Sequence, residues 1–117
     1  MRVISYRHKG SPGVGVMTSD KDFVCLANAA PELPDSLRSI LAGDPDLEAV
    51  RAATEGKSAD LSIDDVTLEP VIPAPHATWA LALNYTLHIE ETGLTTSPDY
   101  PQIFQRMPIC QVAHEEA

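Results

Sequence analysis

Three short apolar runs, separated by polar or glycine-containing turns, occupy the first quarter of the chain. The runs lie at residues 2–8, 14–17 and 23–26, and the turns between them lie at residues 9–13 and 18–22. Valine, isoleucine and tyrosine favour extended structure, and short connections place consecutive strands beside each other. The pattern therefore predicts an antiparallel β-meander.

Gly13 and Gly15 form a Gly-x-Gly at the start of the second run. A phosphate-binding loop of this type needs a third glycine at a set spacing and a helix that begins directly after it. Neither follows in this sequence, so the two glycines predict no nucleotide site.

Apolar residues then recur at helical spacing. A helix is expected from an N-cap at Asp35 to Gly43, and a second helix from Asp44–Pro45 to Gly56. Each has one apolar face, formed by Leu37, Ile40 and Leu41 in the first helix and by Leu47, Val50 and Ala53 in the second. A small sheet needs a cover for its apolar face, so we expect both helices to pack on the meander.

The chain becomes extended over residues 58–72, where apolar and polar residues alternate with a one-residue shift of phase at Asp64–Asp65. Three prolines between residues 70 and 75 fix φ and remove backbone donors. We interpret residues 70–75 as the boundary between an N-terminal domain, residues 1–70, and a second unit, residues 71–117.

The second unit begins with an apolar run. Trp79–Leu83 contains five apolar residues without a breaker, which predicts a short buried strand. A helix is expected next, from an N-cap at Thr86 to a stop at Gly93. A loop over residues 92–99 and a further short strand at Ile103–Phe104 follow. Together with the meander and its helices, this gives an α+β fold class.

His88 and Glu91 are three residues apart within this expected helix, so they share one of its faces. Imidazole titrates near neutral pH, and a neighbouring carboxylate orients the ring and stabilises its charged form. The pair is therefore suited to proton transfer. A solvated surface pair has the same spacing, so the spacing alone leaves both interpretations open.

Acidic residues outnumber basic residues by 17 to 8, and the formal net charge is −9. We therefore expect no nucleic acid and no acidic membrane as a partner, because binding to either depends on basic residues. No apolar run reaches the length of a membrane span or a signal peptide, so we expect a cytoplasmic protein. Cys25 and Cys110 are far apart in sequence, and we expect two reduced, largely buried thiols.

Four segments stand in a distinctive order: residues 4–15, Ile72-Pro73-x-Pro75, Asn84-Tyr85-x-x-His88-x-x-Glu91, and Pro101-Gln-Ile-Phe104-Gln-Arg106. Their order and spacing resemble the fumarylacetoacetate hydrolase family, in which the first segment belongs to a small N-terminal domain. The resemblance covers essentially the whole chain. Two positions depart from the family pattern, since Arg106 stands where many members have lysine and Ala82 stands where glycine is usual.

The resemblance implies a metal-dependent enzyme that acts on 2-oxo or acylpyruvate-type acids by C–C bond hydrolysis, decarboxylation or isomerisation. Such enzymes use magnesium or another divalent cation. The resemblance gives His88 the role of general base and Glu91 the role of orienting it. It also implies that Asn84, Tyr85 and Arg106 bind the substrate.

The family's metal ligands, a Glu-x-Glu pair and a distant Asp, have no counterpart in this sequence. The resemblance therefore implies the N-terminal part of such an enzyme, with the first strand–helix–strand of an incomplete mixed β domain. We expect no bound metal and no activity for these residues alone. The missing C-terminal β domain would complete the site for a small oxo acid. Without it, we expect the second unit to expose Trp79, Leu81, Leu83, Ile103 and Phe104, and either to self-associate as a homo-oligomer or to be partly disordered.

Two other interpretations stay open. The first is a small non-catalytic binding or oligomerisation module, since the chain is acidic and carries no complete site. The second is a zinc site, because the spacings of His88 and Glu91 and of Cys110 and His114 suit that metal.

Overall fold

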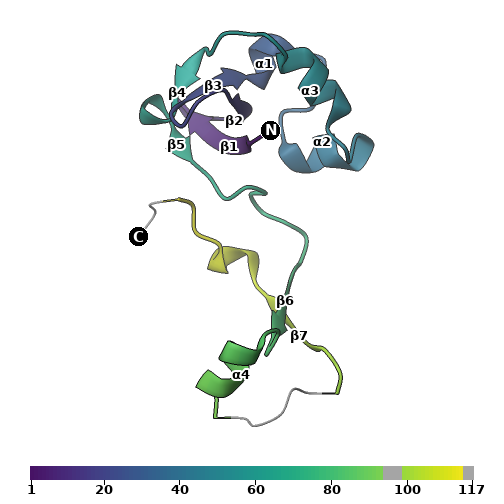
Figure 1. Ribbon diagram of the computed structural model, residues 1–117. Helices are drawn as coiled ribbons and strands as arrows, with labels where there is room; N and C mark the ends of the chain where they lie inside the picture. Colours follow the sequence, from purple (N-terminus) through teal and green to yellow (C-terminus); the bar gives the residue numbers. More distant parts are fainter. Residues whose placement is uncertain (94–98, 115–117) are drawn as a thin grey trace. The chain divides into compact units, whose positions relative to one another are not determined.

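The computed structural model of the chain describes residues 1–93 and 99–114 (Figure 1). The chain forms two units. Met1–Pro73 belongs to the first unit together with the segment that begins at Val112, and Ala74–Gln111 forms the second. The sequence pattern gives no indication that the C-terminal segment joins the first unit.

A five-stranded antiparallel sheet is the framework of the first unit. Its strands are β1 (Val3–His8), β2 (Ser11–Met17), β3 (Asp22–Cys25), β4 (Leu61–Ser62) and β5 (Thr67–Leu68), in the order β4-β3-β2-β1-β5. The predicted meander is confirmed as β1–β2–β3. The turn between β1 and β2 is two residues long, with φ values of 50° at Lys9 and 87° at Gly10. Tight hairpin turns require such left-handed residues.

The sheet is curled, and the link between its two edge strands shows why. Strands β4 and β5 lie at opposite edges, yet only a single turn of 3₁₀-helix, η1 (Ile63–Asp65), and one more residue connect them. Five residue steps from Ser62 to Thr67 span at most about 18 Å. The two edges of a flat sheet of five strands would be about 19 Å apart, which is farther than this link can reach. The sheet must therefore curl to bring β4 and β5 closer together. The shift in the alternation of apolar and polar residues at Asp64–Asp65 corresponds to this 3₁₀ turn.

Three helices complete the first unit: α1 (Leu26–Ala29), α2 (Leu37–Gly43) and α3 (Glu48–Thr54). The two predicted helices are confirmed, but both predicted starts are wrong. Ser36 rather than Asp35 caps α2, with its hydroxyl accepting a hydrogen bond from the N–H of Ser39 at 3.3 Å. Helix α3 begins at Glu48, after a left-handed Leu47, although the Asp44 carboxylate does accept a hydrogen bond from the N–H of Ala49 at 2.8 Å.

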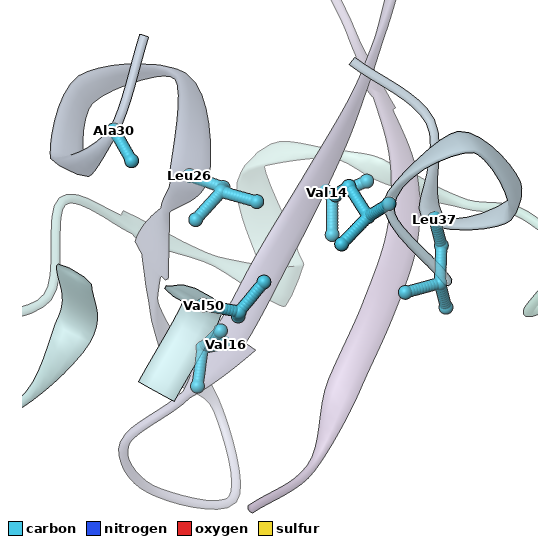
Figure 2. Close-up of a cluster of buried hydrophobic side chains, with 7 residues drawn as sticks. Val14, Val16, Leu26, Ala30, Leu37 and Val50 are labelled. Atoms are coloured by element: carbon cyan, nitrogen blue, oxygen red, sulfur yellow. The ribbon is translucent and has the colours of Figure 1, made fainter. Parts of the chain in front are cut away.

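The outer face of the sheet carries the main hydrophobic core, shown in Figure 2. Val14 and Val16 of β2 pack there against side chains from all three helices. The helix residues buried in this cluster are Leu26, Ala30 just after α1, Leu37, Ile40 and Val50. The helices therefore cover the meander, as the sequence predicts.

A second cluster fills the inside of the curl. Its buried members are Tyr6, Phe23 and Cys25, and the two aromatic rings meet with centroids 4.9 Å apart. Gly13 and Gly15 lie on this side of β2, since side chains alternate along a strand. A Cβ at Gly13 would lie 2.7 Å from the Tyr6 ring, and one at Gly15 would lie 2.5 Å from the Phe23 ring. The Gly-x-Gly therefore makes room for two rings.

Gly15→Ala should destabilise the first unit, because the added Cβ collides with a ring that is completely buried. We expect the free energy of unfolding to fall by about 1–3 kcal/mol. Urea denaturation followed by circular dichroism measures it. Gly43→Ala, where no described atom outside the local helix backbone and the adjoining residues lies within 4 Å of the new Cβ, is the matched control and should be neutral or slightly stabilising. Equal stability of the two variants would contradict the prediction.

The hydroxyl of Tyr6 lies 2.9 Å from Sγ of Cys25, and either group can donate the hydrogen bond. Burial, supported by this hydrogen bond, raises the pKa of the Tyr6 phenol far above its ordinary value. The folded state thus holds the phenolic proton more tightly than the unfolded state does. This stabilisation is complete below the ordinary tyrosine pKa of about 10 and is lost as pH rises above that value.

Tyr6→Phe should remove this pH dependence. Above about pH 10 we expect the stability of the wild-type protein to fall more steeply than that of Tyr6→Phe, by up to about 1.4 kcal/mol per pH unit. Urea denaturation between pH 8 and 11 tests this. Tyr100→Phe makes the same change at an exposed tyrosine and should retain the wild-type slope. Parallel slopes for wild type and Tyr6→Phe would show that the phenol does not ionise on unfolding.

The second unit contains a two-stranded antiparallel hairpin and one short helix. Its elements are β6 (Thr78–Ala82), α4 (Thr86–Glu91), β7 (Gln102–Arg106) and a 3₁₀ turn, η2 (Pro108–Cys110). The predicted order of strand, helix and strand is present, and the α+β class is confirmed. Most of the loop predicted over residues 92–99 lies outside the described residues.

Strand β6 is not buried, so that prediction is wrong. Trp79 and Leu81 are exposed, because the hairpin has no second layer of strands among the described residues. Ile103 and Phe104 of β7 are also exposed, which confirms the exposure expected at four of the five positions. Leu83, the fifth, is half-buried.

Two further details of the prediction need correction. Tyr85 rather than Thr86 occupies the N-cap position of α4, and its side chain makes no capping hydrogen bond to the described residues. Both cysteines are free, but only Cys25 is buried, whereas Cys110 is exposed on η2. Across residues 1–93 and 99–114, no helix combines the length and the apolar character needed to cross a membrane.

Candidate functional site

Helix α4 brings His88 and Glu91 together. Nδ1 of His88 lies 3.7 Å from Oε2 of Glu91, with the side chains 38% and 74% exposed respectively. The distance is too long for a hydrogen bond but suits an ion pair when the imidazole is protonated. The predicted adjacency of these two residues follows directly from the three-residue spacing on a helix.

Tyr85 supports the imidazole from the start of the helix. Its ring centroid lies 5.5 Å from that of His88, and the ring planes are tilted by 37°. The carbonyl of Tyr85 also accepts a hydrogen bond from the N–H of His88 at 3.1 Å. His88 therefore contacts a phenol ring and lies close to a carboxylate, and its partly exposed edge can reach a ligand or water.

A left-handed leucine joins strand β6 to this helix. Leu83 has φ of 54°, directly before Asn84 and Tyr85. A non-glycine residue in this conformation costs about 1–2 kcal/mol, so the surrounding structure must maintain it. The turn at Leu83 ends the strand and starts the segment that leads to His88.

Asn84 lies at a different feature, a hollow of about 420 Å³ at the end of the hairpin. The hollow is lined by Leu81, Ala82, Leu83, Asn84, Asp99, Tyr100, Pro101, Gln102 and Ile103. Its polar groups are one carboxylate, two amides and one phenol, and no described lysine or arginine lines it. His88 and Glu91 are not among the residues that line this hollow.

Arg106 lies at the opposite end of the hairpin. It pairs with Thr78 at the start of β6, whereas Gln102 pairs with Ala82 at the end that leads to α4. Four residue steps separate the two ends, about 13 Å along the strand. The structure therefore does not bring Arg106 next to His88 and Glu91 within this unit.

The described residues offer no metal centre. Nowhere in residues 1–93 and 99–114 do three or more His, Cys, Asp or Glu side chains gather where they could hold a metal ion. Magnesium needs several convergent oxygen ligands, and zinc in proteins takes three or four side chains. The described residues therefore provide no ligand group for magnesium or for zinc.

Sequence reasoning missed the residues that line the hollow beside Asn84, namely Asp99, Tyr100 and Gln102. They carry no motif, so only the pairing of β6 with β7 shows their proximity to Asn84. The distance of Arg106 from His88 could have been predicted from the sequence. In an antiparallel hairpin, residues late in the second strand lie beside residues early in the first.

The chain was compared with models of known protein families and with curated proteins, and it matches none of them.

Leu83→Val should loosen α4, because a β-branched residue resists the left-handed conformation more strongly than leucine does. A cost of about 1–2 kcal/mol corresponds to about 5- to 30-fold faster hydrogen exchange at the amides of Ile89 and Thr92. The N–H of Ile89 donates to the carbonyl of Tyr85, and the N–H of Thr92 donates to the carbonyls of His88 and Ile89. Leu83→Asn, which tolerates the conformation, is the control and should not accelerate exchange. Equal exchange rates in both variants would contradict the role given to this turn.

Proposed function

We propose that these residues form the N-terminal part of a fumarylacetoacetate hydrolase-like, metal-dependent enzyme that acts on 2-oxo or acylpyruvate-type acids. The reaction class is C–C bond hydrolysis, decarboxylation or isomerisation. The observation that carries the proposal is the local arrangement on α4, where His88 lies between the ring of Tyr85 and the carboxylate of Glu91. The order of motifs from Ile72 to Arg106 supplies the family.

In this proposal His88 is the general base. It is exposed enough to meet a substrate or a water molecule. When it takes up a proton, the carboxylate of Glu91 at 3.7 Å stabilises the imidazolium that forms. Tyr85 limits the rotation of the imidazole by packing against it. In this arrangement the imidazole of His88 takes up a proton and releases it again, while Tyr85 and Glu91 hold the ring in place.

The remaining parts of the site must come from elsewhere. Because the described residues contain no metal-binding group, the proposal assigns the divalent cation, magnesium or another, to residues outside those described. The substrate-binding roles proposed for Asn84 and Arg106 likewise need additional structure, since the two residues lie at opposite ends of the hairpin. A cytoplasmic location is part of the proposal, since both thiols are free and would stay reduced there.

A second candidate function is a non-catalytic binding or oligomerisation module. The exposed apolar residues of β6 and β7 favour it, because such surface usually marks a contact with another polypeptide. This candidate gives His88 and Glu91 no chemical role, so their substitution distinguishes it from the enzyme.

His88→Gln in the product of the complete reading frame that contains residues 1–117 should lower kcat for an acylpyruvate by about 10²- to 10⁴-fold, the usual contribution of a general base. Glu91→Gln should lower kcat less, because the imidazole remains. Glu90→Gln is the matched control, since it changes the neighbouring exposed carboxylate of the same helix. The assay follows loss of the acylpyruvate absorbance with magnesium present.

Three results would overturn the proposal. One is the absence of magnesium-dependent turnover by that complete product. Another is full activity of His88→Gln. The third is turnover by residues 1–117 alone, which would show that no additional metal ligands are needed.

A further inference from the structure

The hollow at the end of the β6–β7 hairpin has the size and the mixed lining of a small-molecule site. Its volume is about 420 Å³, and ligand pockets usually measure about 300–1,000 Å³. Leu81 and Ile103, which pair across the two strands, give it an apolar side. Asp99 and Tyr100 add a carboxylate and a phenol. A ligand that fills the hollow therefore needs an apolar body as well as a polar group.

Asp99 gives the hollow the only charge among the described residues that line it. Arg106, the one basic residue of the two strands, is four residue steps from Gln102, about 13 Å along β7. This distance exceeds the screening length of about 8 Å at physiological ionic strength, so Arg106 does not offset the carboxylate. The chain as a whole has a formal net charge of −9. The hollow therefore attracts cations and repels anions.

The side-chain oxygens of the hollow are available as hydrogen-bond acceptors. Among residues 1–93 and 99–114, the side chains of Asn84 and Asp99 make no hydrogen bond and no ion pair. Nε2 of Gln102 donates to the carbonyl of Tyr100 at 3.5 Å, which leaves the side-chain oxygen of Gln102 as an acceptor. An ammonium group carries three N–H donors and no acceptor, so it matches a carboxylate with two amide oxygens.

A metal cation does not suit the same groups. Magnesium and calcium bind through several convergent oxygen ligands, and zinc takes three or four side chains. The hollow has one carboxylate, and the described ranges hold no cluster of three His, Cys, Asp or Glu side chains. An organic cation needs fewer charged ligands, because its apolar part also contributes to binding. Tyr100 is 79% exposed, and the face of its ring can attract such a cation.

We propose that this hollow binds a small organic amine in its protonated form. The ammonium group lies at the carboxylate of Asp99, and an apolar or aromatic body packs against Leu81 and Ile103. The side-chain oxygens of Asn84 and Gln102 accept the remaining N–H groups.

This inference does not rest on the proposed catalytic function. Neither His88 nor Glu91 lines the hollow. The ligand carries a positive charge, whereas an oxo acid carries a negative one, so different compounds test the two proposals. Failure of one proposal leaves the other unaffected.

Three probe compounds of nearly the same shape separate the effect of charge from that of apolar contact: benzylammonium, benzyl alcohol and benzoate. Each is titrated near neutral pH into isotope-labelled protein of residues 1–117, and amide chemical shifts are recorded. Benzylammonium should shift the amides of Asn84 and Gln102 along a saturating curve, with a dissociation constant on the order of 1 mM. Benzyl alcohol should bind about fivefold more weakly, because it lacks the ion pair. Benzoate, which the carboxylate repels, should give no saturating shift.

Asp99→Asn should weaken the binding of benzylammonium about fivefold, the upper range for an exposed ion pair, and should leave that of benzyl alcohol unchanged. Glu90→Gln is the matched control, since it changes the net charge equally at an exposed carboxylate of α4 that does not line the hollow. It should leave both affinities unchanged. Tyr100→Leu, which removes the aromatic ring, should weaken the binding of benzylammonium about two- to fivefold. The amide spectra confirm that each variant is folded.

Several results would overturn the inference. The absence of a saturating shift with benzylammonium, or equal binding of benzoate, would exclude a cation site. Equal effects of Asp99→Asn and Glu90→Gln would show that the amine responds to the net charge and not to this carboxylate. Shifts confined to the amides of the first unit would place the bound amine elsewhere.

Discussion

The first unit depends on the close approach of two aromatic rings to the backbone of one strand. Tyr6 and Phe23 lie against β2 at Gly13 and Gly15, where any side chain would collide with them. The rings fill the inside of the curled sheet, while the valines of the same strand face the helices on the outside. One strand therefore holds two hydrophobic clusters together. This unit has a core of its own, and its stability comes from packing on both faces of β2.

The elements of the second unit have little stability of their own, and the same is true of the candidate site on α4. Helix α4 has six residues, too few to be stable by itself in water. The exposed pair of His88 and Glu91 adds little, since such ion pairs contribute about 0–1 kcal/mol. The left-handed Leu83 even costs free energy. The geometry of the pair therefore depends on the packing of α4 through Ile89, its one buried residue.

Features set by neighbouring residues could be predicted from the sequence, and features set by distant ones could not. The meander, the two covering helices and the adjacency of His88 and Glu91 follow from strand and helix periodicity. The start of α3 was missed because Asp44 reaches the helix across a left-handed Leu47. The apolar run of β6 predicts burial, but burial requires a second layer that residue types do not specify. The distance between Arg106 and α4 depends on the hairpin register.

The two sheets differ in how they end. In the first unit the outermost strands, β4 and β5, are two residues long, and their connection through η1 closes one side of the curl. Strands so short offer almost no free backbone N–H and C=O groups to an incoming polypeptide, which protects against edge-to-edge aggregation. Strands β6 and β7 are five residues long, and within the described part of the chain each has a single neighbour. If this chain joins intermolecular β-structure or forms fibrils, the growth will start at residues 78–82 or 102–106, while the curled sheet stays intact.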